Sequence, residues 1–159
     1  MDPLLKKLQF KGGRLVVLGA REEYGLDDLI AGWSKEPEVT KVSSRLGKRE
    51  TFVLCFVRRF AEIERLSERV AAAVPGDGLV WFAYPKKSSP HYHPEVGRDS
   101  SWQPLGDVGF EGVRQVAIDD EWSALRFRRA EFIETFNRSW AMSADGKRRV
   151  AAARTKGSR

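Results

Sequence analysis

A chain of 159 residues with 42% aliphatic and aromatic residues and 31% charged residues has the length and composition of one soluble globular domain. Its apolar runs fall short of the roughly 18 residues that cross a membrane. Its first residues lack the basic start and long apolar stretch of a signal peptide, so we expect a cytoplasmic protein. A lone cysteine, Cys55, excludes an internal disulfide, and its apolar neighbours favour a buried role over that of a nucleophile.

The net charge of +6 is concentrated near the carboxyl end. Residues 141–159 carry Lys147, Arg148, Arg149, Arg154, Lys156 and Arg159 against Asp145 alone, so the rest of the chain is nearly neutral. Such a tail can add salt-sensitive affinity for nucleic acid, but it lacks aromatic residues on which bases stack. We therefore expect a single domain over residues 1–140 and a flexible, solubilising basic tail over 141–159, with neither nucleic acid nor membrane as the main partner.

The first part of the chain predicts alternating strands and helices. Residues 14–20 are almost continuously apolar and predict a strand that is covered on both faces. Residues 27–33 predict a short helix, which ends before Pro37. Residues 39–46 alternate in polarity and predict an exposed edge strand, whereas the apolar residues 51–57 predict a central strand.

The second part predicts the clearest helix and a terminal hairpin. Apolar residues recur on one helical stripe over residues 60–74, and residues 79–84 predict a fourth strand. After a proline-rich loop and a short, interrupted helix, residues 113–118 and 122–129 predict two strands, and their three-residue connection permits only an antiparallel hairpin. Residues 131–140 predict a last helix packed on the sheet.

This order of elements resembles the Rossmann-like sheet of class I methyltransferases over residues 13–129, with an abbreviated first half. The resemblance implies a three-layer α/β fold with a mostly parallel sheet of six strands, in the order 2-1-3-4-6-5, which ends in the antiparallel hairpin. If strands two and three are parallel, about five residues must cross strand one, whereas such crossovers usually take a dozen or more. An antiparallel pairing of strands two and three is therefore the alternative.

Two motifs resemble more closely an uncharacterised bacterial family of small Rossmann-like domains of unknown function. They are the Pro-Lys-Lys-Ser-Ser loop at residues 85–89 and the Asp-x-x-Trp-Ser-x-Leu-x-Phe hairpin at residues 119–127. This resemblance brings no assigned activity with it.

The methyl-donor site of class I methyltransferases needs a glycine-rich loop after the first strand and an acidic residue at the end of the second. Here the first strand leaves through Gly19 with one glycine where two or three are needed, and the second ends in Ser43, Ser44 and Arg45. Neither requirement is met. We therefore expect no cofactor, and we favour a noncatalytic or degenerate module over an enzyme.

A different constellation follows the strands. Basic side chains and hydroxyls stand at the carboxyl ends of strands one, three and four: Arg21, Arg58, Arg59, Lys86, Lys87, Ser88 and Ser89. In a parallel sheet these groups converge on one crevice and would suit a phosphate or carboxylate, which arginine binds in a bidentate manner. The alternative is that loops are commonly charged and that Glu22 and Glu23 neutralise the first loop.

Secondary candidates lie after the fourth strand and around the hairpin: Asp99, Asp119, Trp122, Ser123 and Arg126. The acidic residues 119–121 could bind a divalent cation or supply a general base, although a solvated hairpin turn is the commoner role of such a cluster. For Trp122 and Arg126, which share one face of their strand, a core or stacking role is favoured over chemistry.

His91 and His93 lie on one side of an extended segment and, with Glu95 or Asp99, could hold a metal. Their flanking prolines favour an ordinary surface loop, and we expect no metal.

Three functions stay open. The leading one is a noncatalytic or degenerate methyltransferase-like module that binds an anionic small molecule or a protein partner. The second is an enzyme that acts on a nucleotide-like substrate on the same scaffold. The third is a nucleic-acid accessory protein that binds through its basic tail.

Overall fold

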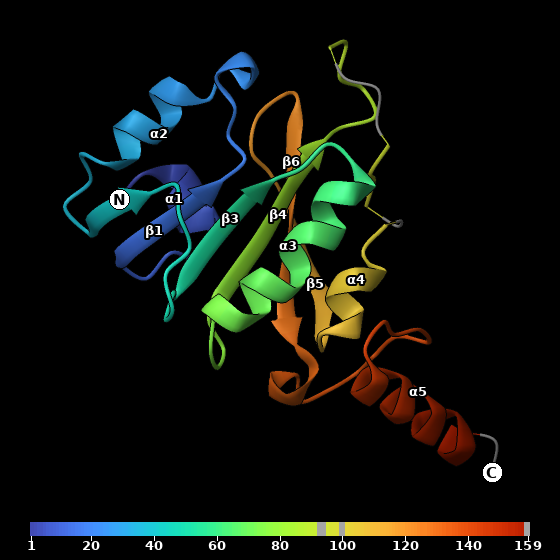
Figure 1. Cartoon of the computed structure of the whole chain (residues 1–159). Helices are drawn as coiled ribbons and strands as arrows, with labels where there is room; N and C mark the ends of the chain where they lie inside the picture. Colours follow the sequence, from blue (N-terminus) through green and yellow to red (C-terminus); the bar gives the residue numbers. More distant parts are fainter. Residues whose placement is uncertain (92–94, 99–100, 158–159) are drawn as a thin grey trace.

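Six strands form one sheet in the computed structural model, which describes residues 1–91, 95–98 and 101–157 (Figure 1). The strands are β1 (Gly13–Leu18), β2 (Val39–Ser43), β3 (Phe52–Phe56), β4 (Leu79–Pro85), β5 (Phe110–Ala117) and β6 (Trp122–Arg129). Their order is β2-β1-β3-β4-β6-β5, in which β1 to β4 are parallel and β6 and β5 are antiparallel. The predicted sheet, with β2 at its edge and a terminal hairpin, is confirmed.

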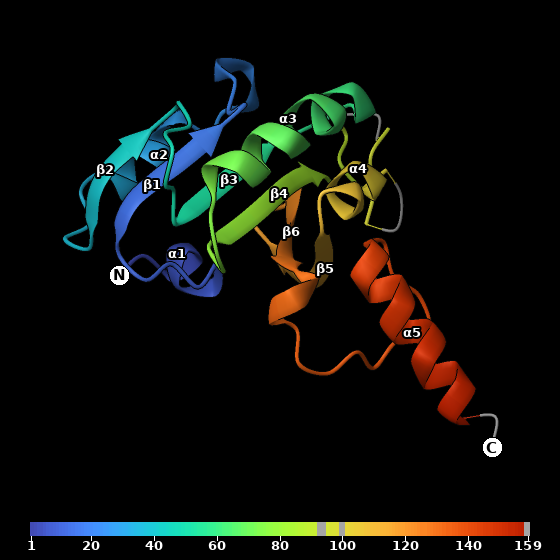
Figure 2. The same ribbon diagram turned by 60° about the horizontal axis from the view of Figure 1, so that its bottom comes forward.

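Helices cover both faces of the sheet and give the three predicted layers (Figure 2). On one face lie α1 (Pro3–Lys7), the short 3-10 helix η1 (Glu22–Tyr24) and α2 (Asp27–Trp33). On the other lie α3 (Phe60–Ala73) and α4 (Gln103–Asp107). Among the described residues no helix has the length and apolar character needed to span a membrane.

The two cores follow from the alternation of side chains along the strands. Leu15 of β1 packs on the α2 side with Trp33, whereas Val53 of β3 packs on the α3 side with Ile63. Strands β1, β3 and β4 contribute side chains to both cores and are therefore apolar on both faces. This continuous apolar character is what predicts strands with helices on both sides. Neither α1 nor η1 was among the predicted elements, because helices of 5 and 3 residues are too short to display a periodic pattern.

The connection from β2 to β3 runs over the α3 side of β1, where Leu46 packs against that core. Arg14 of β1 holds it in place. The Arg14 Nε atom lies 2.8 and 3.0 Å from the two carboxylate oxygens of Glu50, and its Nη2 atom donates to the Ser43 hydroxyl at 3.1 Å. The Glu50 side chain is 4% exposed and that of Arg14 is 35% exposed, so the carboxylate of this ion pair is buried while the arginine still reaches water.

Strands β2 and β3 are both parallel to β1 and lie on opposite sides of it. The antiparallel pairing of strands two and three is therefore wrong. The crossover is possible in so few residues because β2 ends at Ser43, earlier than predicted, and the connection runs in an irregular path without a helix.

The predicted helix over residues 131–140 is also wrong. The chain forms the short 3-10 helix η2 (Ala130–Phe132) and then continues without a helix until α5 (Ala144–Gly157). The Arg149 guanidinium explains the difference, because it donates to the carbonyl oxygens of Ala130, Ile133 and Glu134. These carbonyl groups would otherwise accept the hydrogen bonds of a helix over this stretch.

A buried carboxylate fixes the start of α5. Glu111 of β5 is fully buried and accepts hydrogen bonds from Arg138, from the backbone N–H groups of Met142 and Ser143, and from the Ser143 hydroxyl. Ser143 in turn accepts a hydrogen bond from the N–H of Gly146 and caps the helix. The basic segment after residue 141 is thus helical and attached at its start, and its flexibility stays a prediction.

We expect the Glu50→Ala variant to lose about 2 kcal/mol in free energy of unfolding, because it leaves the half-buried Arg14 guanidinium without its carboxylate. Urea denaturation measures the loss. The matched control is Arg148→Ala, which removes an exposed ion pair with Asp145 and should cost at most about 0.5 kcal/mol. Equal losses in the two variants would show that the Arg14–Glu50 pair does not hold the crossover.

Candidate functional site

The loops that follow β1, β3 and β4 lie together at one edge of the sheet, which we call the carboxyl edge. Strand pairing places β3 between β1 and β4, with all three pointing the same way. The Val57 N–H just after β3 donates to the Ala83 carbonyl of β4 at 2.8 Å, so the two exits are adjacent. The premise that these exits share a rim is therefore correct.

Tyr24 interacts with two of the predicted cations, directly with Arg58 and electrostatically with Arg21. Its ring is buried and packs against the ring of Trp122, with centroids 4.9 Å apart, and its hydroxyl is hydrogen bonded to Arg58. Burial, and after it the Glu62 carboxylate, raise the pKa of the Tyr24 hydroxyl above its ordinary value, while Arg58 and Arg21 act to lower it. The side chains that follow β1 and β3 therefore share one electrostatic environment.

The first turn of α3 is already supplied with carboxylates. Glu62 accepts hydrogen bonds from the N–H groups of Arg58 and Arg59, each at 2.9 Å, and Glu95 accepts one from the N–H of Phe60 at 3.0 Å. The start of a helix attracts anions because its N–H groups are unpaired. Here carboxylates already bind the N–H of Phe60 and the two N–H groups just before the helix, so an anion at this edge would rely mainly on side chains.

The loop after β4 forms a tight turn. The Lys86 N–H donates to the Glu121 carbonyl at 2.7 Å, and the Ser89 N–H donates back to the Lys86 carbonyl at 3.0 Å. The Ser89 hydroxyl oxygen accepts a hydrogen bond from the N–H of His91 at 3.3 Å, a contact that does not use the O–H with which Ser89 would bind an anion. Lys87 and Ser88 are exposed.

A cavity of about 430 Å³ opens between the exits of β1 and β2. The residues that line it include Gly19, Arg21 and Asp27, together with Ser43 at the end of β2 and Ser44 just after it. The cavity does not reach Lys86. Of the predicted cations, Arg58 is hydrogen bonded to Tyr24 and Arg21 acts on the same hydroxyl only electrostatically, while Lys86 and Lys87 stand on the loop after β4 at the same edge.

The hairpin candidates have structural roles. The Asp119 carboxylate accepts hydrogen bonds from the N–H groups of Glu121 and Trp122, both at 2.8 Å. Asp119 thus stabilises the hairpin turn. Trp122 is fully buried and Ser123 nearly so. Arg126 donates to Gln9 at 2.9 Å and lines a cavity at the opposite, amino-terminal ends of β3 and β4, so it does not join the carboxyl edge.

The remaining candidates concern metal and thiol chemistry. His91 contacts the carboxylate of Glu121, whereas His93 and Asp99 lie outside the described residues. Within the described part of the chain, no group of three or more His, Cys, Asp or Glu side chains could hold a metal ion. Cys55 is fully buried, and burial raises the pKa of its thiol, so it has the environment of a core residue.

Comparison with solved structures shows two methyltransferases with a similar fold. One is a candidate type 11 methyltransferase from Sulfolobus solfataricus, with a TM-score of 0.51 and 13% identity over 85% of this chain and 94% of that chain. The other is a SAM-dependent methyltransferase from Aquifex aeolicus, with a TM-score of 0.50 and 17% identity over 80% and 88%. No family model and no curated protein matches the sequence. The chain therefore has a methyltransferase-like Rossmann fold, and at these identities the likeness extends to the fold alone.

The residues at the β1 and β2 exits do not fit the methyl donor that this fold commonly binds. A Cβ atom on Gly19 would lie 2.4 Å from the Phe56 carbonyl oxygen, so the glycine permits close packing of the loop on β3 instead of the approach of a nucleoside. At the end of β2, where the methyl-donor site needs an acidic residue, the strand ends in Ser43. The Ser43 hydroxyl accepts a hydrogen bond from Arg14. We derive no methyl-transfer step for this site.

Sequence reasoning missed Tyr24 and a larger cavity of about 730 Å³ between the β5–β6 hairpin, α4 and residues 138–142. Tyr24 gave one signal, since it is a lone aromatic residue in an otherwise charged loop. The cavity gave none, because its wall is formed by the stretch that was assigned to a helix.

Gly19→Ala should lose at least about 3 kcal/mol in free energy of unfolding, since φ is +73° and the new methyl group would overlap the Phe56 carbonyl oxygen. Gly25→Ala is the matched control, because its φ of +68° is similar but open space surrounds the new methyl group. It should lose only about 1–2 kcal/mol. Similar urea midpoints for the two variants would contradict a packing role for Gly19.

Proposed function

We propose that this protein is a noncatalytic or degenerate methyltransferase-like module whose carboxyl edge binds an anionic small molecule. The observation that carries the proposal is that adjacent parallel strands release Arg21, Arg58 and Lys86 at the same edge, where Arg21 and Arg58 share the surroundings of Tyr24. Cations that converge from several strand ends are typical of phosphate and carboxylate sites in open α/β sheets.

The charges already present leave room for such a ligand. Arg21 pairs with Glu23 at 3.5 Å, and both side chains are about 60% exposed. An exposed pair of this kind contributes between about 0 and 1 kcal/mol, so a phosphate can displace it at little cost. Lys86 and Lys87 would add charge from the neighbouring loop, with the Ser88 hydroxyl beside them.

The misfit of the methyl-donor site supports the noncatalytic part of the proposal. We also propose that the chain belongs to the uncharacterised bacterial family that its Pro-Lys-Lys-Ser-Ser loop and its hairpin resemble. We further propose that it is a cytoplasmic protein.

One observation favours a second function, an enzyme that acts on a nucleotide-like substrate. The cavity beside Arg21 offers the Asp27 carboxylate and the Ser44 hydroxyl, which are groups that bind ribose hydroxyls, next to the apolar Ile30 and Val42. A nucleotide that stabilises the protein far more than inorganic pyrophosphate does would favour this function.

Tail-mediated binding of nucleic acid is supported less well. The guanidiniums of Arg149 and Arg154 both donate to backbone carbonyl oxygens, so part of the basic charge of α5 has an internal role. Steep salt-dependent DNA binding that vanishes on deletion of residues 141–159 would favour it nevertheless.

The anion site is tested by a double variant, Lys86→Ala with Lys87→Ala, titrated with inorganic pyrophosphate by calorimetry at fixed ionic strength. Loss of two cationic contacts should weaken binding by about a hundredfold. The matched control is Lys6→Ala with Lys7→Ala, which removes an exposed lysine pair with the same change in net charge from α1. Equal affinities in the two double variants would remove the carboxyl edge from consideration.

A further inference from the structure

Strand β5 is an open edge of the sheet. It pairs with β6 on one side, and among the described residues no backbone group pairs with the other side of residues 113–117. At the start of this side, Arg138 donates to the Gly112 carbonyl at 2.8 Å. An edge strand with unpaired N–H and C=O groups is a template for a further strand.

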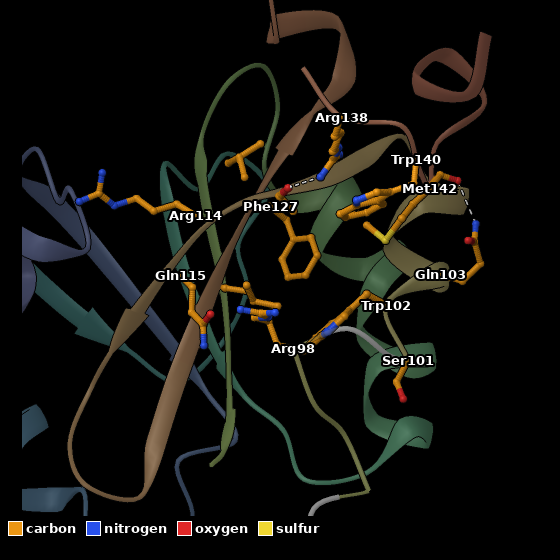
Figure 3. Close-up of a pocket in the computed structure, with 13 residues that line it drawn as sticks. Arg98, Ser101, Trp102, Gln103, Arg114, Gln115, Phe127, Arg138, Trp140 and Met142 are labelled. Atoms are coloured by element: carbon orange, nitrogen blue, oxygen red, sulfur yellow. Dashed lines mark hydrogen bonds between the residues drawn. The ribbon is translucent and has the colours of Figure 1, made fainter. Parts of the chain in front are cut away.

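A preformed groove with an apolar floor and several polar side chains at its walls runs beside this edge. The cavity of about 730 Å³ has Trp102 and Phe127 among its lining residues, and both are buried (Figure 3). Val113 and Trp140 also line it and are 42% and 55% exposed. Besides Met1, they are the large hydrophobic side chains that the described chain leaves exposed, and both lie at this groove. Exposed apolar groups gathered at a cavity mark an interaction site.

The wall that carries Trp140 is held rigidly. Arg138 lies over the Trp140 ring, with its guanidinium carbon 4.0 Å from the ring centroid, and it donates to the buried Glu111 carboxylate at 2.5 Å. The same carboxylate binds the N–H groups of Met142 and Ser143. A groove that exists before the ligand arrives lowers the entropy that binding costs.

The opposite face of the hairpin is cationic. The Arg114 side chain points away from the groove (Figure 3), and Arg114 lies opposite Arg126 in the strand register. Within the described residues Arg114 has neither a hydrogen bond nor an ion pair. Burial, and then the charges of Arg128 and Arg114, lower the pKa of Arg126. Like charges directly opposite each other are unfavourable in a sheet, so this face is complementary to an acidic group.

We propose that β5 and its groove bind an extended acidic peptide segment of a partner protein, which joins the sheet as an additional strand. Side chains of a strand alternate between its two faces, so an apolar residue of the peptide would enter the groove beside Trp140 while an acidic neighbour would face Arg114. A compact small molecule could fill the groove but would leave the N–H and C=O groups of the open edge unpaired. This docking surface is separate from the carboxyl edge and does not depend on the anion site.

The test begins with selection of a random-peptide library, displayed on phage, against the full-length chain. We expect the enriched peptides to alternate acidic and apolar residues. Hydrogen exchange with a synthetic enriched peptide should then protect the amides of residues 113–117, because these groups become paired. No enrichment of such sequences, or protection at another site, would overturn the proposal.

Matched variants connect the binding to the surface. Trp140→Ala and Arg114→Glu should each weaken peptide binding by at least about tenfold. Lys41→Glu, at an exposed position on the opposite edge strand β2, makes the same charge reversal and should leave the affinity unchanged. Unfolding midpoints near that of the parent chain show that the variants fold.

Two alternative occupants of this surface, a small molecule and a second copy of the chain, would each give a different experimental result. If N-acetylphenylalanine competes as well as the whole peptide, the groove takes a small molecule. If sedimentation shows a dimer that Trp140→Ala and Arg114→Glu dissociate, a second copy of the chain covers β5. Either result overturns the proposal.

Discussion

The short crossover from β2 to β3 is the constraint on which the rest of the molecule depends. Because Arg14 and the buried Glu50 hold this irregular segment over β1, the chain places β3 directly beside β1 and parallel to it. The exits of β1 and β3 then lie so close that the loop after β1 packs on Phe56 through Gly19. The same packing that completes the sheet therefore uses the glycine that a nucleoside site would need.

The carboxyl edge combines cations with carboxylates that have structural roles. Glu62 and Glu95 pair the N–H groups at the start of α3 and stay close to the backbone that they bind. Arg21 forms an exposed ion pair with Glu23, which water screens. At this edge the start of α3 is therefore bound by carboxylates of the chain itself, whereas the Arg21 side chain is accessible to a ligand. At the far end of the sheet, Glu111 organises a separate surface around Trp140.

Most strands of the sheet could be predicted because they are apolar runs with a strong local signal, whereas the weaker edge strand β2 alternates in polarity and the strand order came from the resemblance to class I methyltransferases. The strand from Trp122 to Arg129 matches its predicted bounds, since a turn too short for a crossover precedes it. The helix over residues 131–140 failed for a tertiary reason. The spacing of Phe132, Phe136 and Trp140 fits a helical face, but Arg138 and Arg149 lie over the Phe136 ring, and Arg149 takes the carbonyl groups. No local pattern reveals a partner that distant residues supply.

The most direct measurement of the central claim is an amide-resolved NMR titration of the full-length chain with inorganic pyrophosphate. Our account predicts saturable shifts that appear together at residues 19–21, 57–59 and 86–89, because one ligand contacts three neighbouring strand exits. Shifts confined to residues 141–159, or no saturable shift at the three exits, would contradict it.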